Sequence, residues 1–225
     1  LKTDNLKPGD FISLDQYEST VRGRLQHTQG KEPETDQYRG GTIAVDHASG
    51  KVYVHHQVSL QTGETLVGKQ LWEQDLKQYG YNVKHYHTDN GVFKSKEFQA
   101  DLKKHSQTID FSGTGAHHQN GVAERAIRTV VEWARTLMLH SALHWPEEAD
   151  LKLWPFAMSY AAEIWNNLPN KQNGISPNEI VSHTLQADFT SLKRAHVWGC
   201  PVYVLEPAHQ DGRKLPKWIP RSRRG

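Results

Sequence analysis

Residues 87 to 91 read His87-Thr88-Asp89-Asn90-Gly91, and residues 117 to 125 read His117-His118-Gln119-Asn120-Gly121-Val122-Ala123-Glu124-Arg125. The residues from 83 to 87 alternate in polarity after a helical stretch, which predicts a strand that ends just before Asp89. Apolar residues recur at spacings of three and four from Val122 to Leu137, which predicts a helix with Glu124 near its start. The sequence therefore places one carboxylate after a strand and another on a helix.

Two carboxylates on separate elements make a metal site possible, because Mg²⁺ prefers oxygen ligands and is usually held by one or two carboxylates plus substrate phosphates. Arg128 and Arg135 share a stripe of the predicted helix with Glu124, which suits phosphates held by metal and cation together. Taken separately, Asp-Asn-Gly is a common turn, and Glu with Arg four positions on is usually a solvated pair. The order and spacing of the two stretches favour the site.

Composition limits the remaining possibilities. A chain of 225 residues can bury one substantial core. It has a single cysteine, so an internal disulfide and a cysteine-based zinc finger are excluded and a reducing, intracellular setting is favoured. No apolar run approaches the length of a membrane span, and we expect no signal peptide and a piece of a longer chain. Because the net charge is only +2, binding of nucleic acid would need local basic patches.

The order of predicted elements indicates an α/β fold with a mixed sheet flanked by helices. Strands are expected at 9–16, 41–46, 51–58, 83–87 and 108–111, with 19–38 as a long loop. Helices are expected at 65–79 and 95–105, from Glu124 to about 143, and from about 147 to 168. We divide the chain into a core of residues 1–168 and an extension of residues 169–225. In the extension, Ser176 caps a helix, a small β element lies within 194–205, and a basic tail follows.

These stretches resemble the integrase core of copia-type LTR retrotransposons. The resemblance rests on Gly9 to Asp15, the two stretches quoted above, and a continuation that covers nearly the whole chain: Ile127-Arg128-Thr129, Ala134 to Leu137, Trp154, Ile175-Ser176-Pro177 with Glu179, and Val197 to Tyr203. It implies a ribonuclease H-like fold and a catalytic triad of Asp15, Asp89 and Glu124. Two features depart from the family: residues 113–118 lack its usual proline, and residues 19–38 are longer than in many relatives. The family's upstream His/Cys zinc module is absent from this sequence.

The resemblance also implies a reaction, in which the 3′-hydroxyl of element cDNA attacks a phosphodiester of target DNA and joins the strands. Two Mg²⁺ or Mn²⁺ ions can activate the attacking oxygen and neutralise the leaving oxygen. Our hypothesis is that Asp15 bridges both ions, while Asp89 and Glu124 each hold one. We expect Asn90, His118, Gln119 and Asn120 to position DNA or the metal shell. Three arginines are expected to contact phosphates: Arg125, Arg128 and Arg135.

Several alternatives stay open at this stage. Asp46 also follows a predicted strand, but its context is better explained as a hairpin turn that accepts backbone hydrogen bonds. Histidine pairs, including His85 with His87, permit a structural zinc site, although no helical His-x-x-x-His spacing occurs. The tryptophans at 133, 154 and 165 are expected in the core. The chain could also be an inert DNA-binding or assembly module, or a ribonuclease H-like nuclease or transposase.

The expected partners are element cDNA ends, target DNA and a chromatin or host tethering factor, with no membrane. Joining two DNA ends needs more than one active site, so we expect a homo-oligomer, with the apolar positions of the 147–168 helix as a contact. Integration implies a nuclear location or a cytoplasmic particle in a eukaryotic host.

Overall fold

The computed structural model describes residues 5–28, 30–89, 91–113, 120–171, 173–185, 190–213, 216, 218 and 221–224. Five strands form a mixed sheet in the order β3-β2-β1-β4-β5. They are β1 (Ile12–Gly23), β2 (Tyr38–Asp46), β3 (Val52–Gln57), β4 (His85–Thr88) and β5 (Thr108–Phe111). The first three are antiparallel, while β4 is parallel to β1 and to β5. The predicted mixed sheet is confirmed.

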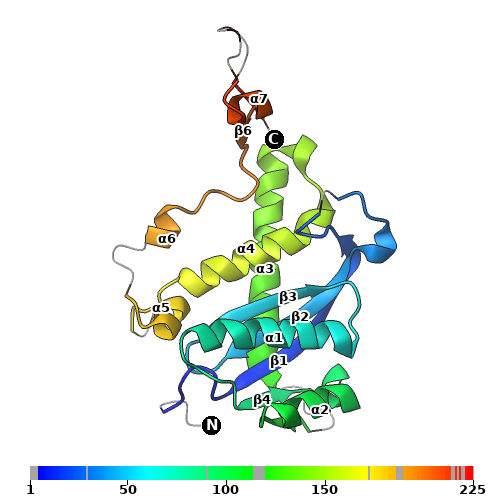
Figure 1. The fold of residues 1–225 in the computed structure, drawn as a ribbon, viewed down its shortest axis with the longest axis vertical. Helices are drawn as coiled ribbons and strands as arrows, with labels where there is room; N and C mark the ends of the chain where they lie inside the picture. Colours follow the sequence, from blue (N-terminus) through cyan, green and yellow to red (C-terminus); the bar gives the residue numbers. More distant parts are fainter. Residues whose placement is uncertain are drawn as a thin grey trace.

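Helices cover both faces of this sheet (Figure 1). Alternating residues of β1 enter two separate cores, because successive side chains of a strand point to opposite faces. Ile12 and Leu14 pack with α1 (Thr62–Gln78) and α2 (Lys96–Lys104). Tyr17 packs with α3 (Gly121–His144) and α4 (Trp154–Asn167). On α3 the buried positions include Ala126 and Val130, as the predicted apolar stripe requires.

The first strand is longer than predicted. Residues 19–23, expected in a loop, continue β1, and only residues 24–37 connect it to β2, with a 3-10 turn at Glu34–Asp36. Contacts distant in sequence extend the strand: the indole Nε1 of Trp154 donates to the carbonyl of Val21 at 2.8 Å, and Arg24 N donates to Lys152 O. Residues 19–38 are polar and contain glycines, so nothing in their own sequence indicates that Trp154 and Lys152 will bond to them.

The helix predicted from 147 to 168 is also corrected. Two 3-10 turns, Pro146–Glu148 and Leu151–Leu153, precede α4, which begins only at Trp154. Pro155 stands in the first turn, where proline is tolerated because it lacks a backbone N–H. Ala157 and Met158 of α4 lie in the core, whereas Phe156 and Ile164 are partly exposed, so the expected contact between copies through this helix stays a prediction. Trp154 is buried there, and Trp133 and Trp165 pack against the same core, as predicted.

The C-terminal part contains the predicted capped helix. Ser176 and Glu179 form a reciprocal capping box at α5 (Pro177–Ser182), and Val181 of this helix is fully buried in the core. Beyond α6 (Thr190–Lys193), strand β6 (Tyr203–Leu205) pairs with β7 (Ser222–Arg224), with α7 (Pro207–Gln210) between them. The boundary at residue 168 stays a prediction. None of the described helices is both long and apolar enough to span a bilayer.

Candidate active site

Asp15 lies on β1, and Asp89 directly follows the neighbouring parallel strand β4, at a matching position. Leu14 of β1 pairs with Thr88 of β4, and each aspartate is the next residue in its chain. Adjacent strands are about 4.8 Å apart, and residues in register point to the same face. Both carboxylates are partly exposed on the face opposite the buried Leu14 and Thr88. The Asp15 carboxylate accepts the Gln16 N–H at 2.8 Å, and that of Asp89 accepts the Gly91 N–H at 3.3 Å.

Asn120 attaches the start of α3 to this point of the sheet. Its Nδ2 donates to the carbonyl of Leu14 at 2.9 Å, one residue before Asp15, and the side chain is only 1% exposed. Glu124 follows in the first turn of α3 and is partly exposed. The Asn120 side chain is thus held inside the fold, and its expected role in positioning DNA or the metal shell stays a prediction.

The three predicted arginines lie along the outside of α3. Arg125, Arg128 and Arg135 are all exposed, so their guanidinium groups are accessible to a ligand from solvent. The N-terminus of a helix also carries unsatisfied N–H groups and a partial positive charge, which favour phosphate nearby. Together these groups give the surface beside Glu124 a positive character.

Three other predicted site residues, Asn90, His118 and Gln119, lie outside the described residues. Within the described part, no three side chains of histidine, cysteine, aspartate or glutamate are grouped so that they could hold a metal ion. The strand register and the Asn120 hydrogen bond therefore bring the first residues of β1, the end of β4 and the start of α3 together, without forming a closed set of metal ligands.

The comparisons with known proteins agree with this arrangement. No protein-family model matches the chain. The retrovirus-related Pol polyprotein from transposon TNT 1-94 of Nicotiana tabacum is 27% identical over 179 residues, which make up 78% of this chain. The matched chain spans 13% of that polyprotein.

Solved integrase structures share the fold. The HTLV-2 integrase catalytic core domain in complex with magnesium has a TM-score of 0.53 and 20% identity, over 78% of this chain and 97% of that one. A chain of the simian T-cell lymphotropic virus intasome in complex with PP2A regulatory subunit B56 gamma has a TM-score of 0.58 and 17% identity, over 97% of this chain and 67% of that one.

The chain is homologous to a retrotransposon Pol polyprotein and has the fold of a retroviral integrase catalytic core. The predicted ribonuclease H-like class is thereby confirmed. The narrower resemblance to copia-type elements stays a prediction.

Within this integrase fold, Asp46 has the structural role predicted for it. Its side chain is fully buried at the end of β2 and accepts the N–H of Gly9, and both the N–H and the hydroxyl of Ser49, at 2.6–2.8 Å. Burial raises the pKa of Asp46 despite these hydrogen bonds. Because its oxygens are occupied inside the hairpin, Asp46 does not compete with Asp15 for a place in the site.

A row of polar side chains crosses the sheet one pleat before the two aspartates. Ser13 pairs in register with His87, and His87 with Asp110 on β5. One Asp110 oxygen lies 2.9 Å from His87 Nδ1 and 2.8 Å from His85 Nε2. Burial raises the pKa of Asp110, but the hydrogen bonds from the two histidines outweigh it and lower the pKa overall. His85 and His87 are thus paired with this carboxylate, and no histidine in the described part of the chain belongs to a group of three side chains that could hold a metal ion.

The sequence contained a signal for this row, since Asp110 alternates with apolar residues in a predicted strand. Its position beside His85 and His87 depended on strand order, which the sequence does not specify. His47 completes the row through Ser13, at 2.8 Å, and burial lowers its pKa to about 4.

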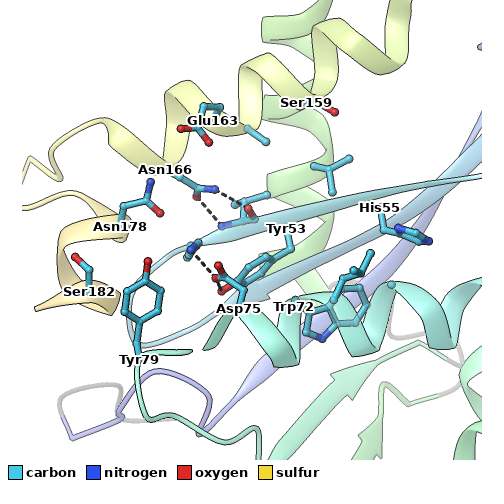
Figure 2. Close-up of a pocket in the computed structure, with 16 residues that line it drawn as sticks. Tyr53, His55, Trp72, Asp75, Tyr79, Ser159, Glu163, Asn166, Asn178 and Ser182 are labelled. Carbon is cyan, nitrogen blue, oxygen red and sulfur yellow. Dashed lines mark hydrogen bonds and ion pairs between the residues drawn. The ribbon is translucent and has the colours of Figure 1, made fainter. Parts of the chain in front are cut away.

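A cavity of about 550 Å³ between α1, β3 and α4 lies apart from these carboxylates (Figure 2). The side-chain amide of Asn166 on α4 accepts the N–H of Val52 and donates to its carbonyl, so it pairs with this edge strand as the backbone of another strand would. Lys51 Nζ lies 2.7 Å from Asp75 Oδ2. Because β3 is the sheet edge away from β4, and none of Asp15, Asp89 and Glu124 lines this cavity, it is not the candidate active site.

Proposed function

We propose that this chain is the catalytic core of a retrotransposon integrase, a metal-dependent polynucleotidyl transferase that joins the 3′-hydroxyl ends of element cDNA to target DNA. The observation that carries the proposal is the convergence of three carboxylate-bearing segments. Asp15 and Asp89 are the residues next to the paired Leu14 and Thr88 of parallel strands β1 and β4, and the Asn120 side chain ties the first turn of α3, with Glu124, to Leu14. Homology to a Pol polyprotein and the integrase fold support it.

The donor chemistry fits Mg²⁺ or Mn²⁺. Asp15, Asp89 and Glu124 supply only oxygen ligands, which hard divalent cations prefer, and all three are partly exposed at the surface where a substrate could reach them. The HTLV-2 core is a magnesium complex, which supports use of the same ion here. When bound, a pair of ions would make the attacking oxygen nucleophilic and neutralise charge on the leaving oxygen. The use of two ions stays part of the proposal.

The residues around the carboxylates would bind and orient DNA. Arg125, Arg128 and Arg135 would contact phosphates, which give affinity and register rather than sequence choice. Asn120 would hold Glu124 in position relative to Asp15 through Leu14. Asn90, His118 and Gln119 remain candidates for positioning DNA or the metal shell on sequence grounds alone.

The expected partners follow from the reaction. Joining two cDNA ends to target DNA in a concerted way needs at least two active sites, so we propose that the chain works as a homo-oligomer, in the nucleus of its host or in a cytoplasmic particle that precedes it. The intasome among the structural neighbours supports assembly on DNA. A chromatin or host tethering factor is an additional proposal.

A strand-transfer assay with a duplex that mimics an element end tests the function. Glu124→Gln should abolish joined products while leaving DNA binding unchanged, because it removes a charged ligand and preserves the shape of α3. The matched control is Glu132→Gln, an exposed glutamate two turns further along the same helix, which should retain full activity. Joined products from Glu124→Gln would refute the role of Glu124.

Two other outcomes of the assay would change the proposed function. Cleavage without joining would indicate a ribonuclease H-like nuclease. Salt-sensitive DNA binding without any metal-dependent product, in this chain and in the longer protein, would indicate an inert assembly module.

A further inference from the structure

Two histidines lie on one side of α3 near its C-terminal end, where the helix extends beyond the sheet (Figure 1). His140 and His144 are four positions apart, and residues at this spacing are neighbours on the surface of a helix. Both side chains are exposed, and their ring centroids are 4.3 Å apart. The pair has the helical His-x-x-x-His spacing that we expected to be absent, so that expectation from the sequence is wrong.

The distance between the two rings suits the binding of one ion by both. A histidine nitrogen binds a transition metal at about 2.0–2.1 Å, so two imidazoles on one ion, about 90–110° apart, have ring centroids about 4.5–5.2 Å apart. The observed 4.3 Å reaches this range with a small rotation about side-chain torsions. Histidines at this spacing on one helix also bind zinc together in the H-E-x-x-H motif of metalloproteases. The backbone of α3 therefore has the geometry that chelation needs.

The surroundings of the pair favour a positive ion. Trp145 packs against both rings, with centroid distances of 6.2 Å to His140 and 5.7 Å to His144. This packing restricts the rings before any ion binds, which lowers the entropy cost of ordering them. The C-terminus of a helix carries a partial negative charge, which attracts cations. Glu147 and Glu148 follow directly, are exposed, and form no ion pair with a cation in the described part of the chain.

We propose that His140 and His144 together bind one transition-metal dication of the kind that imidazole prefers, namely Cu²⁺, Ni²⁺ or Zn²⁺. Among the described residues, no third side chain of histidine, cysteine, aspartate or glutamate joins the pair, so water completes the coordination. Mg²⁺ does not compete, because it prefers oxygen ligands. The site is built from other residues than the family's upstream His/Cys zinc module.

This site is separate from the candidate active site. His140 follows Glu124 by 16 residues of the same helix, which corresponds to about 24 Å at 1.5 Å per residue. The two sites also select different ions, since one offers imidazole nitrogens and the other carboxylate oxygens. The inference therefore does not depend on the proposed function, and either one can fail without the other.

Isothermal titration calorimetry of the metal-free chain with Ni²⁺ measures the dissociation constant of this site. His140→Ala and His144→Ala should each raise the dissociation constant roughly tenfold or more, because one imidazole remains where two acted together. Both residues are exposed and alanine is a good helix former, so both variants should fold like the parent, which thermal unfolding checks. An excess of Mg²⁺ should leave Ni²⁺ binding unchanged, and Cu²⁺ should bind more tightly than Ni²⁺.

Two control variants separate the pair from histidine content. His27→Ala removes an exposed histidine outside α3 and should leave the dissociation constant unchanged. The double variant His144→Ala, Ala142→His keeps the number of histidines but places the second one on another side of the helix, because two positions correspond to about 200° of rotation. It should bind Ni²⁺ as weakly as His144→Ala does.

Pulsed EPR of bound Cu²⁺ counts the imidazoles that hold the ion. The parent at one equivalent of Cu²⁺ should show two coordinated imidazoles, and His144→Ala should show one. Equal dissociation constants for Ni²⁺ in the parent, His140→Ala and His144→Ala would overturn the proposal. So would parent-like affinity in the double variant, a loss of affinity in His27→Ala as large as in His144→Ala, or a Cu²⁺ spectrum that His144→Ala leaves unchanged.

Discussion

The substitution Lys69→Met removes a positive charge that is completely buried in the protein. The Lys69 side chain on α1 is 0% exposed, and its Nζ lies 2.8 Å from Glu73 Oε1 and 2.7 Å from Asp101 Oδ2 of α2. Methionine keeps the packing of the aliphatic stem but leaves both carboxylates without their cation. Removing one partner of a buried ion pair costs about 3–5 kcal/mol, because the remaining charge is left uncompensated.

The lower end of that range applies here, since both carboxylates keep other donors. Glu73 still accepts from the Tyr86 hydroxyl at 2.5 Å and from Gln107 Nε2 at 2.7 Å. Asp101 still has His105 Nδ1 at 3.4 Å. We therefore expect a loss of about 3 kcal/mol. For a chain of this size each kcal/mol lowers Tm by about 2–4 °C, so Tm should fall by about 6–12 °C.

Urea unfolding and differential scanning calorimetry measure this loss. The control is Lys77→Met, an exposed lysine two turns further along α1, whose effect should stay within about 0.5 kcal/mol. Burial raises the pKa of Asp101, but the hydrogen bond and charge of Lys69 outweigh it and lower the pKa overall. The stabilisation is thus present above the ordinary aspartate pKa and lost as pH falls through the lowered one, so the difference between parent and variant should shrink below about pH 4. Equal stability of Lys69→Met and Lys77→Met at neutral pH would refute the reasoning.

Three further predictions concern the site and its supports. Asn120→Ala should reduce strand transfer roughly 10–100-fold through misplacement of Glu124, with DNA affinity unchanged, and a fully active variant would contradict the positioning role. Arg128→Ala should weaken DNA binding and reduce the slope of log K against log salt by about one in a titration, whereas Lys103→Ala on α2 should change neither. Burial lowers the pKa of His56 to about 3, so its stabilisation is present above the ordinary histidine pKa and lost as pH falls. Acidification from pH 7 to pH 5 should cost the parent about 2 kcal/mol more than it costs His56→Gln, as measured by urea unfolding at the two values; an identical loss in both chains would exclude this histidine as the source.

Elements whose signals are local were predictable from the sequence. The β2–β3 hairpin follows from two β-rich runs around a short turn, and Ser95 caps α2 by accepting the Phe98 N–H, as its place before the apolar pattern indicates. The Ser176 capping box needs only residues three positions apart. In each case the interacting groups are neighbours in the chain, so sequence pattern and structure coincide.

Element ends set by tertiary contacts were not predictable. The last residues of β1 have the composition of a loop, and they are held as strand by Trp154, which is 133 residues away from Val21. The 147–168 segment keeps a helical period, yet the chain turns twice before Pro155 fixes the start of α4. Periodicity identifies the face that is buried, but it does not determine where a helix begins.

The candidate site also combines features that were predictable from local sequence with features that depend on tertiary contacts. The turn role of Asp46 was visible in its own sequence context. The register that sets Asp15 beside Asp89, and the bond from Asn120 to a carbonyl 106 residues away, depend on strand order and on the packing of α3. The sequence could name the carboxylates through a resemblance, whereas the placement of β1, β4 and the start of α3 beside one another required the fold.

Strand transfer by the parent chain and by Asp89→Asn, with Mg²⁺ or Mn²⁺ and with EDTA, tests the central claim most directly. Asparagine keeps the shape of the turn after β4 and removes the charge that would hold a metal ion. The account predicts joined products from the parent only when metal is present, and none from Asp89→Asn, with equal DNA binding by both. Metal-dependent joining by Asp89→Asn at the parent's rate would contradict it.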